Sequence, residues 1–232
     1  MVHPKAKDLI YRTIPLGLLQ QALPRVAASR SPFLPEIVDR KVIFIHIPKA
    51  AGSSLKTELY GAPTGGHRRI VEYAAYDGPK TRDFFKVSFV RNPWDRLLSA
   101  YSYLKNRTAT SYRDRSFAST FLDQTEDINA FVLALEDRKY RRAVMLYDHF
   151  RPQGHWICMP GARNHAMDFI GRFETMEADM AALRDRLALP PGAVAKTRAS
   201  QHLPYREAYT RRARDLVADI YARDIALLDY SF

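Results

Sequence analysis

The alternation of apolar strands with amphipathic helices predicts an α/β fold built around a parallel sheet. Val42–Ile47 is a nearly continuous apolar run rich in β-branched residues, which is typical of a strand buried on both faces of such a sheet. Similar runs at Phe84–Val90 and Asp168–Phe173 predict two further strands. Helical segments lie between the strands, and this order of elements is the pattern of βαβ units.

Helices are expected between and after these strands. They are Leu55–Tyr60, the segment that begins after Asn92, Asp127–Leu135, Glu174–Leu187 and Tyr205–Leu228. Asn92 is a favourable N-cap, and Pro93 is a favourable first helical residue. The apolar side chains that follow share one face of that helix: Trp94, Leu97, Leu98, Tyr101 and Leu104. Pro190, Pro191 and Gly192 are expected to end the helix that begins at Glu174.

Length and composition are those of a folded globular chain. The 232 residues suffice for one domain or two small ones, and the 47% hydrophobic content argues against wholesale disorder. Residues 1–40 are rich in proline and predict an irregular arm or short helices packed on a body of residues 41–232.

The single cysteine, Cys158, excludes an intrachain disulfide and fits a reducing compartment. With no long apolar run and no convincing signal peptide, the expected location is the cytoplasm.

The charge of the chain is strongly positive. The formal net charge is +11, and basic residues are concentrated between positions 80 and 115. A basic protein attracts polyanions, which include nucleic acid, an anionic membrane and a phosphorylated or sulfated ligand. Composition alone leaves these partners open.

The segment between the first strand and the next helix has the chemistry of an anion site. It consists of Lys49, Ala50, Ala51, Gly52, Ser53 and Ser54. The backbone N–H groups at the start of a helix favour negative charge, and a glycine allows close approach of a ligand. The Walker A motif places its lysine after the glycine, whereas Lys49 precedes Gly52, so this is a different loop. A plain turn capped by a serine is the alternative interpretation.

The end of the second strand is another candidate site. Arg91 lies where ligands bind in open α/β sheets, at the carboxyl end of a predicted parallel strand. Ser99 follows eight positions later and falls almost opposite the apolar stripe of its helix. We therefore expect Ser99 to lie outside the core, either in solvent or facing a ligand.

These two segments resemble the nucleotide motifs of sulfotransferases. Ile45–Leu55 is similar to their 5′-phosphosulfate loop, and Phe85–Tyr101 is similar to their 3′-phosphate motif. The resemblance is to the carbohydrate branch, which contains Golgi enzymes and bacterial relatives, and we expect a chain of the bacterial type. It continues through Asp168–Glu174 and Tyr205–Tyr209 to the Tyr230–Phe232 ending, so it covers about residues 41–232.

The resemblance implies a P-loop-kinase-like, three-layer α/β fold with a central parallel sheet flanked by helices. It implies 3′-phosphoadenosine-5′-phosphosulfate as donor. No metal is expected, since the sequence has neither a His-Glu-x-x-His motif nor a Cys/His cluster. In this family the loop from Lys49 to Ser54 would hold the 5′-phosphosulfate, and Arg91 and Ser99 would hold the 3′-phosphate. Arg198 and Ser200 occupy the place of a basic loop that covers the nucleotide, although an ordinary polar loop would look the same. The family usually has Thr-Ala-Gly-Thr where this chain has Ala-Ala-Gly-Ser, which removes one hydroxyl contact.

Sulfuryl transfer requires positioning, charge stabilisation and a base for the hydroxyl proton. Lys49 is the expected partner of the bridging oxygen. By resemblance the base is His67, in the segment after Gly65 and Gly66, and His46 is a supporting residue in the first strand. The alternative for His67 is a surface histidine beside Arg68 and Arg69, two charges that would lower its pKa or bind an anionic acceptor.

The acceptor is the least defined part of the prediction. The resemblance favours a saccharide, but a lipid, a peptide tyrosine or a secondary metabolite remains open, and no pattern indicates the oligomeric state. Two other functions also remain open. One is a phosphotransferase using ATP, although its Walker lysine and Walker B aspartate are not visible. The other is a basic protein that binds nucleic acid or another polyanion without catalysis, although no nucleic-acid motif accompanies the charge.

Overall fold

The computed structural model describes residues 31–50, 52–61, 66–106, 111–190 and 203–232. These residues form two compact units, each described here by itself. The first unit comprises the described residues up to 91 and those from 153 to 190, and the second comprises 92–152 and 203–232. Most of the arm expected at residues 1–40 lies outside the described part. Within the described ranges, no helix combines the length and apolar character that a bilayer span needs.

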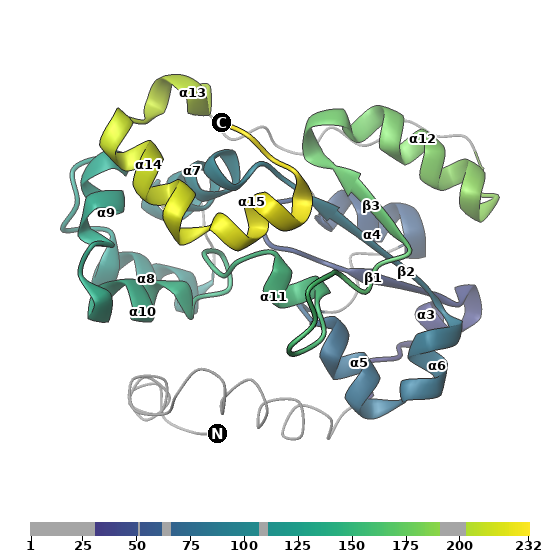
Figure 1. Cartoon of the computed structure of the whole chain (residues 1–232). Coiled ribbons are helices and arrows are strands. Elements are labelled where there is room, and N and C mark those ends of the chain that lie inside the picture. Colours follow the sequence, from purple (N-terminus) through teal and green to yellow (C-terminus); the bar gives the residue numbers. More distant parts are fainter. Residues whose placement is uncertain (1–30, 51, 62–65, 107–110, 191–202) are drawn as a thin grey trace. The chain divides into compact units, whose positions relative to one another are not determined.

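A parallel sheet of three strands forms the centre of the first unit (Figure 1). Its strands are β1 (Val42–Ile45), β2 (Phe85–Val90) and β3 (Phe169–Arg172), and β2 lies between the other two. Val42 pairs with Phe85, and Val87 pairs with Phe169. The predicted α/β class with a parallel sheet is therefore confirmed. β1 ends two residues earlier than predicted, because His46 and Ile47 form the connection between the strand and the turn that begins at Pro48.

Helices α4 (Gly52–Tyr60) and α12 (Met176–Leu187) supply the apolar side chains that cover one face of β1 and β2. The buried members of this cluster are Val42, Phe44, Leu55, Leu59, Val87, Phe89, Met180 and Leu183. Each such side chain contributes about 1.5–3 kcal/mol when it leaves water. This packing fixes α4 against the sheet and places its first turn at the end of β1.

Three short helices of this unit were not predicted, namely α5 (Ile70–Tyr76), α6 (Gly78–Asp83) and α11 (Gly154–Ile157). A fourth, α3 (Pro35–Arg40), lies in the segment for which short helices were one of two alternatives. Each has four to seven residues, which is too short to show a clear helical period. Aromatic contacts fix the segment that leads into α3, since the Phe33 ring packs edge-on against the rings of Tyr73 and Phe84, with centroids 5.3 and 5.8 Å away.

The second unit is helical around an aromatic core. Its helices are α7 (Pro93–Lys105), α8 (Tyr112–Phe121), α9 (Ile128–Ala134), α10 (Arg138–Met145), α13 (Tyr205–Ala208), α14 (Arg211–Ile220) and α15 (Ala222–Leu228). The predicted start of α7 is confirmed, because the Asn92 side chain accepts a hydrogen bond from Trp94 N and Pro93 is the first helical residue. Phe131 and Phe150 lie fully buried at the centre, with their ring centroids 5.2 Å apart.

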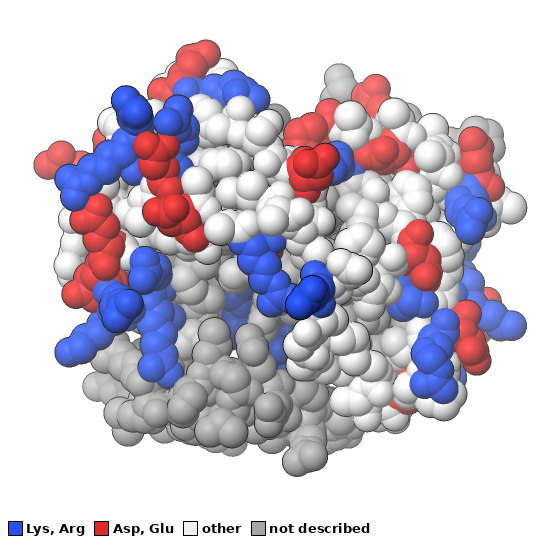
Figure 2. All heavy atoms as spheres, viewed as in Figure 1, with Lys and Arg blue, Asp and Glu red and all other residues white. Residues whose placement is uncertain are grey.

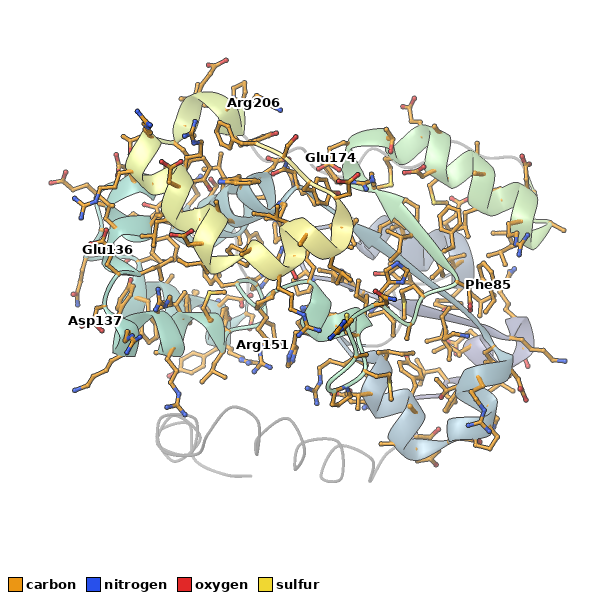
Figure 3. The ribbon with its side chains drawn as sticks, in the orientation of Figure 1. Phe85, Glu136, Asp137, Arg151, Glu174 and Arg206 are labelled. Carbon is orange, nitrogen blue, oxygen red and sulfur yellow. The ribbon has the colours of Figure 1, made fainter. Side chains whose placement is uncertain are left out.

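Two predicted helices differ in their bounds. The single helix expected at Tyr205–Leu228 is wrong, because the segment is broken into α13, α14 and α15. Thr210 starts α14 by accepting a hydrogen bond from Ala213 N at 3.3 Å, and such a hydroxyl competes with continued helix. The helix expected from Glu174 begins at Met176 instead, because Glu174 lies in a 3₁₀ turn after β3 (Figure 3). That helix ends at Leu187, because its C-cap Ala188 has a left-handed φ of 50°, and it therefore stops before Pro190.

Candidate functional site

The turn between β1 and α4 is the predicted anion loop, and it lies wholly in the first unit. Lys49 has a left-handed φ of 69°, which is uncommon for a residue with a side chain and marks a tight reversal of the chain. Ala50 N donates to the Ile47 carbonyl at 3.3 Å, and helix α4 begins two residues later at Gly52. Ala51 and the side chains of Ser53 and Ser54 lie outside what the structure describes.

Gly52 permits the first turn of α4 to pack against His46. A Cβ atom at this position would lie 1.8 Å from the Cδ2 atom of His46, so a larger residue needs the imidazole to move. The His46 ring in turn stacks on Phe44, with centroids 6.1 Å apart. The glycine of the loop is therefore required by packing as well as being suited to ligand approach.

His67 lies beside His46. The Nδ1 atom of His67 is 3.2 Å from the carbonyl oxygen of His46, and the two ring centroids are 4.3 Å apart. The Trp156 ring lies edge-on at 6.0 Å on α11. An N–H must donate to a carbonyl, so this bond places the proton of the neutral ring on Nδ1 and leaves Nε2 unprotonated. The His67 side chain is exposed, as a residue that exchanges a proton with a ligand needs to be.

The two arginines after His67 are engaged by an acidic side chain. Glu72 contacts Arg68 Nη1 at 3.8 Å and Arg69 Nε at 3.4 Å. Arg69 is buried, and its Nη1 lies 3.4 Å from His155 Nε2. Since a carboxylate balances part of their charge, these arginines do not act on His67 as two isolated cations.

Arg91 links the end of β2 to the anion loop. Arg91 as a residue is 6% exposed, and its guanidinium donates to the Lys49 carbonyl at 3.2 Å and lies over the Phe173 ring at 3.9 Å. Gln153 holds the backbone of Arg91 through two hydrogen bonds, of 3.0 Å from Arg91 N and 2.8 Å to Arg91 O. The structure therefore brings together Lys49 and Arg91, which are 42 positions apart in the sequence.

Lys56 is a residue of this region that sequence reasoning missed. It is 6% exposed, and its Nζ donates to the Gly66 carbonyl at 3.1 Å. Burial lowers the pKa of its amine from 10.5 to about 8. The sequence pattern offers no signal for it, since its contact with Gly66 joins two segments that lie ten positions apart.

Ser99 belongs to the second unit, and the burial of its side chain differs from the solvent exposure that was one of its two expected placements. It is 1% exposed, although its place opposite the apolar stripe predicted an exposed or ligand-facing side chain. The solvent-exposed alternative is wrong because α7 is buried on nearly every side, so one apolar stripe does not define its buried face. The ligand-facing alternative stays a prediction. Arg198 and Ser200 lie outside the described residues.

Several basic side chains between residues 80 and 115 bind carbonyl and carboxylate groups of the protein itself. Arg96 is almost fully buried and donates to the carbonyls of His149 and Arg151. Lys105 Nζ donates to two other carbonyls at 2.8 and 2.6 Å, and Lys86 Nζ lies 2.7 Å from Asp168. On the face that Figure 2 shows, Lys and Arg side chains are interspersed with Asp and Glu. Arg96, Lys105 and Lys86 are therefore basic residues of this stretch whose charges are held by contacts within their own unit.

Acidic and histidine side chains do not form a metal centre in the part of the chain that is described, where no three His, Cys, Asp or Glu residues are grouped suitably. Individual carboxylates instead fix helices. Asp137 accepts from Lys139 N and Tyr140 N at the start of α10, and these bonds lower the pKa of Asp137. Glu136 binds Arg212 at 2.9 Å, and both acidic residues are labelled in Figure 3.

Comparisons with known proteins agree on one family. A family model described as "Sulfotransferase family" matches residues 65–231, which is more than half of the chain. Human carbohydrate sulfotransferase 9 is 26% identical over 231 residues, an alignment that covers 82% of this chain and 51% of the human protein. The chain thus spans about half the length of that relative. No solved structure gives a significant match.

Proposed function

Because the chain belongs to the sulfotransferase family, we propose that it transfers a sulfuryl group from 3′-phosphoadenosine-5′-phosphosulfate to a hydroxyl group of a carbohydrate. The family match supports the reaction class, and the name of the human relative supports a carbohydrate acceptor. In this proposal residues 41–232 form the sulfotransferase domain. The observation that carries it is a contact between two candidate binding segments of one unit, where Arg91, the residue after β2, donates to the Lys49 carbonyl of the loop before α4.

The donor supplies the sulfuryl group and a bisphosphate leaving group. The loop residues Lys49, Ala50, Ala51, Gly52, Ser53 and Ser54 would hold its 5′-phosphosulfate through backbone N–H groups, with the Lys49 ammonium beside the bridging oxygen. A tight turn that leads into a nine-residue helix fits this role, because the first N–H groups of a helix have no partner within it.

Arg91 and Ser99 would hold the 3′-phosphate, and Arg198 and Ser200 would cover the nucleotide. The Arg91 guanidinium suits this role because a planar fork of N–H donors matches a phosphate, and Phe173 fixes the plane of that fork. The burial of Ser99 is compatible with a hydroxyl that serves a bound phosphate rather than solvent.

His67 is proposed as the general base. Its Nδ1–H donates to the His46 carbonyl, so the Nε2 lone pair can accept the proton of the acceptor hydroxyl. As that proton moves to Nε2, the acceptor oxygen forms its bond to sulfur. The bond from sulfur to the bridging phosphate oxygen breaks at the same time, and Lys49 stabilises the charge that develops there. No metal is needed in this scheme.

Calorimetry with adenosine 3′,5′-bisphosphate tests the proposal, with ATP and 5′-AMP as matched ligands at physiological salt. We expect saturable binding of the bisphosphate and at least 10-fold weaker binding of the other two. Equal or tighter binding of ATP would favour a phosphotransferase. No binding of any mononucleotide, together with salt-sensitive binding of long polyanions, would favour a basic polyanion-binding protein.

A further inference from the structure

Lys56 is a buried amine in helix α4 that the proposed chemistry does not use. Only 6% of the residue is exposed, and lysine is almost never buried to this extent unless its ammonium is satisfied. Its Nζ donates a 3.1 Å hydrogen bond to the carbonyl of Gly66. This bond connects α4 directly to the residue before His67.

The face of α4 that carries Lys56 also packs against His46. Gly52 and Lys56 are four residues apart and share that face, and at Gly52 the helix approaches the His46 ring closely enough to exclude a Cβ atom. His46 in turn accepts the hydrogen bond from His67 Nδ1. The His67 segment is therefore held at two points, by Lys56 at the Gly66 carbonyl and by His46 at the imidazole.

We propose that Lys56 is a positioning residue, which fixes the Gly66 carbonyl and thereby holds the His67 imidazole on the His46 carbonyl with Nε2 directed to the reacting hydroxyl. The proposal rests on the proposed function, in which His67 is the base. A flexible backbone at Gly66 makes such an anchor useful, since glycine loses more conformational freedom on ordering than any other residue. Burial lowers the pKa of Lys56 only to about 8, so at pH 7 the side chain is still mainly an ammonium that makes a charge-assisted bond.

The tautomer of His67 gives a direct test that needs no acceptor. In the full chain, the imidazole nitrogens of His67 are observed by ¹⁵N NMR and assigned with His67→Gln. We expect the wild-type ring to be protonated on Nδ1, and Lys56→Met to shift it towards the Nε2-protonated form of a free imidazole. Lys80→Met is the control, because Lys80 is a half-exposed lysine that pairs with Asp77 at the start of another helix of the same unit. An unchanged tautomer in Lys56→Met would overturn the proposal.

A second variant covers the case in which Lys56→Met does not fold. Lys56→Gln keeps a polar group but is one bond shorter, so it cannot make the same contact with Gly66, and we expect the same shift of the tautomer.

A double-mutant cycle of Lys56 and His67 adds a kinetic test, in which the transfer of labelled sulfuryl groups from the phosphosulfate donor to desulfated chondroitin is measured. Lys56→Met should lower kcat in the wild type but cause no further loss in His67→Ala, whereas additive losses would assign Lys56 a role independent of His67. Failure of the proposed function is a separate result, namely a wild-type chain that does not bind the bisphosphate.

Discussion

His67 Nδ1 and the carbonyl oxygen of His46 lie 3.2 Å apart, which joins the exit of β1 to a segment 21 positions later in the sequence. The contact fixes the orientation of the exposed imidazole from its inner side. It also explains why a histidine directly after the first strand accompanies the candidate base: His46 contributes through its backbone oxygen and through the ring that packs on Gly52.

Replacing the candidate base should remove transfer and keep nucleotide binding. We expect His67→Asn to lower kcat by about 10²–10⁴-fold, the usual contribution of a positioned general base. The dissociation constant of adenosine 3′,5′-bisphosphate should change less than about 2-fold, because this base acts on the acceptor and not on the nucleotide. Steady-state transfer and calorimetry measure the two effects, with His165→Asn as the control. Near-normal turnover in His67→Asn would remove this histidine from the mechanism.

Arg91→Ala should chiefly weaken binding of the bisphosphate. A charge-assisted hydrogen bond of about 1.5–3 kcal/mol corresponds to a loss of roughly 10–150-fold in affinity. Arg163→Ala removes an equal charge from an exposed position of the same unit and serves as the control in the same calorimetric titration. If Arg91→Ala and Arg163→Ala bind alike, the 3′-phosphate site lies elsewhere.

Lys49→Ala should act on the chemical step more than on binding. Its ammonium is proposed to stabilise charge that develops on the bridging oxygen, and loss of one such interaction costs about 10²–10³-fold in kcat. The dissociation constant of the bisphosphate, which lacks the sulfuryl group, should change far less. A variant that loses affinity and turnover in equal proportion would instead make Lys49 a simple binding residue.

The sheet was predictable from sequence because strands buried on both faces are apolar along their length, as Val42–Ile45 is. The positions of the anion loop and of Arg91 could be predicted from the strands, since both lie at the carboxyl ends of parallel strands. The burial of Ser99 did not follow, because it depends on partners that pack on every side of α7. Lys56 was also missed, because the burial of a lysine is decided by its contact with Gly66, which local periodicity does not encode.

Gly52→Ala should destabilise the fold through a steric conflict with His46. The added Cβ atom would lie 1.8 Å from His46 Cδ2, and overpacking of this kind costs about 1–3 kcal/mol in the free energy of unfolding. Gly66→Ala is the matched control, since a Cβ atom there meets nothing within 4 Å. Urea denaturation measures both, and Gly52→Ala combined with His46→Ala should recover part of the loss. Equal stability of the two single variants would show that the imidazole moves aside without cost.

Lys56 should make the free energy of unfolding depend on pH in the alkaline range. Its pKa is about 8 in the folded chain and 10.5 for an ordinary lysine, so between these values the unfolded chain binds more protons than the folded one. The free energy of unfolding therefore rises with pH across this window, by about 1–3 kcal/mol relative to Lys56→Met. Tyrosines that titrate above pH 10, such as Tyr73 with a pKa of about 12, affect both proteins equally and cancel in the comparison. Urea denaturation of wild type and Lys56→Met at pH 7.5, 8.5 and 9.5 measures the difference. A difference that stays constant over this range would mean that the folded chain does not perturb the proton of Lys56.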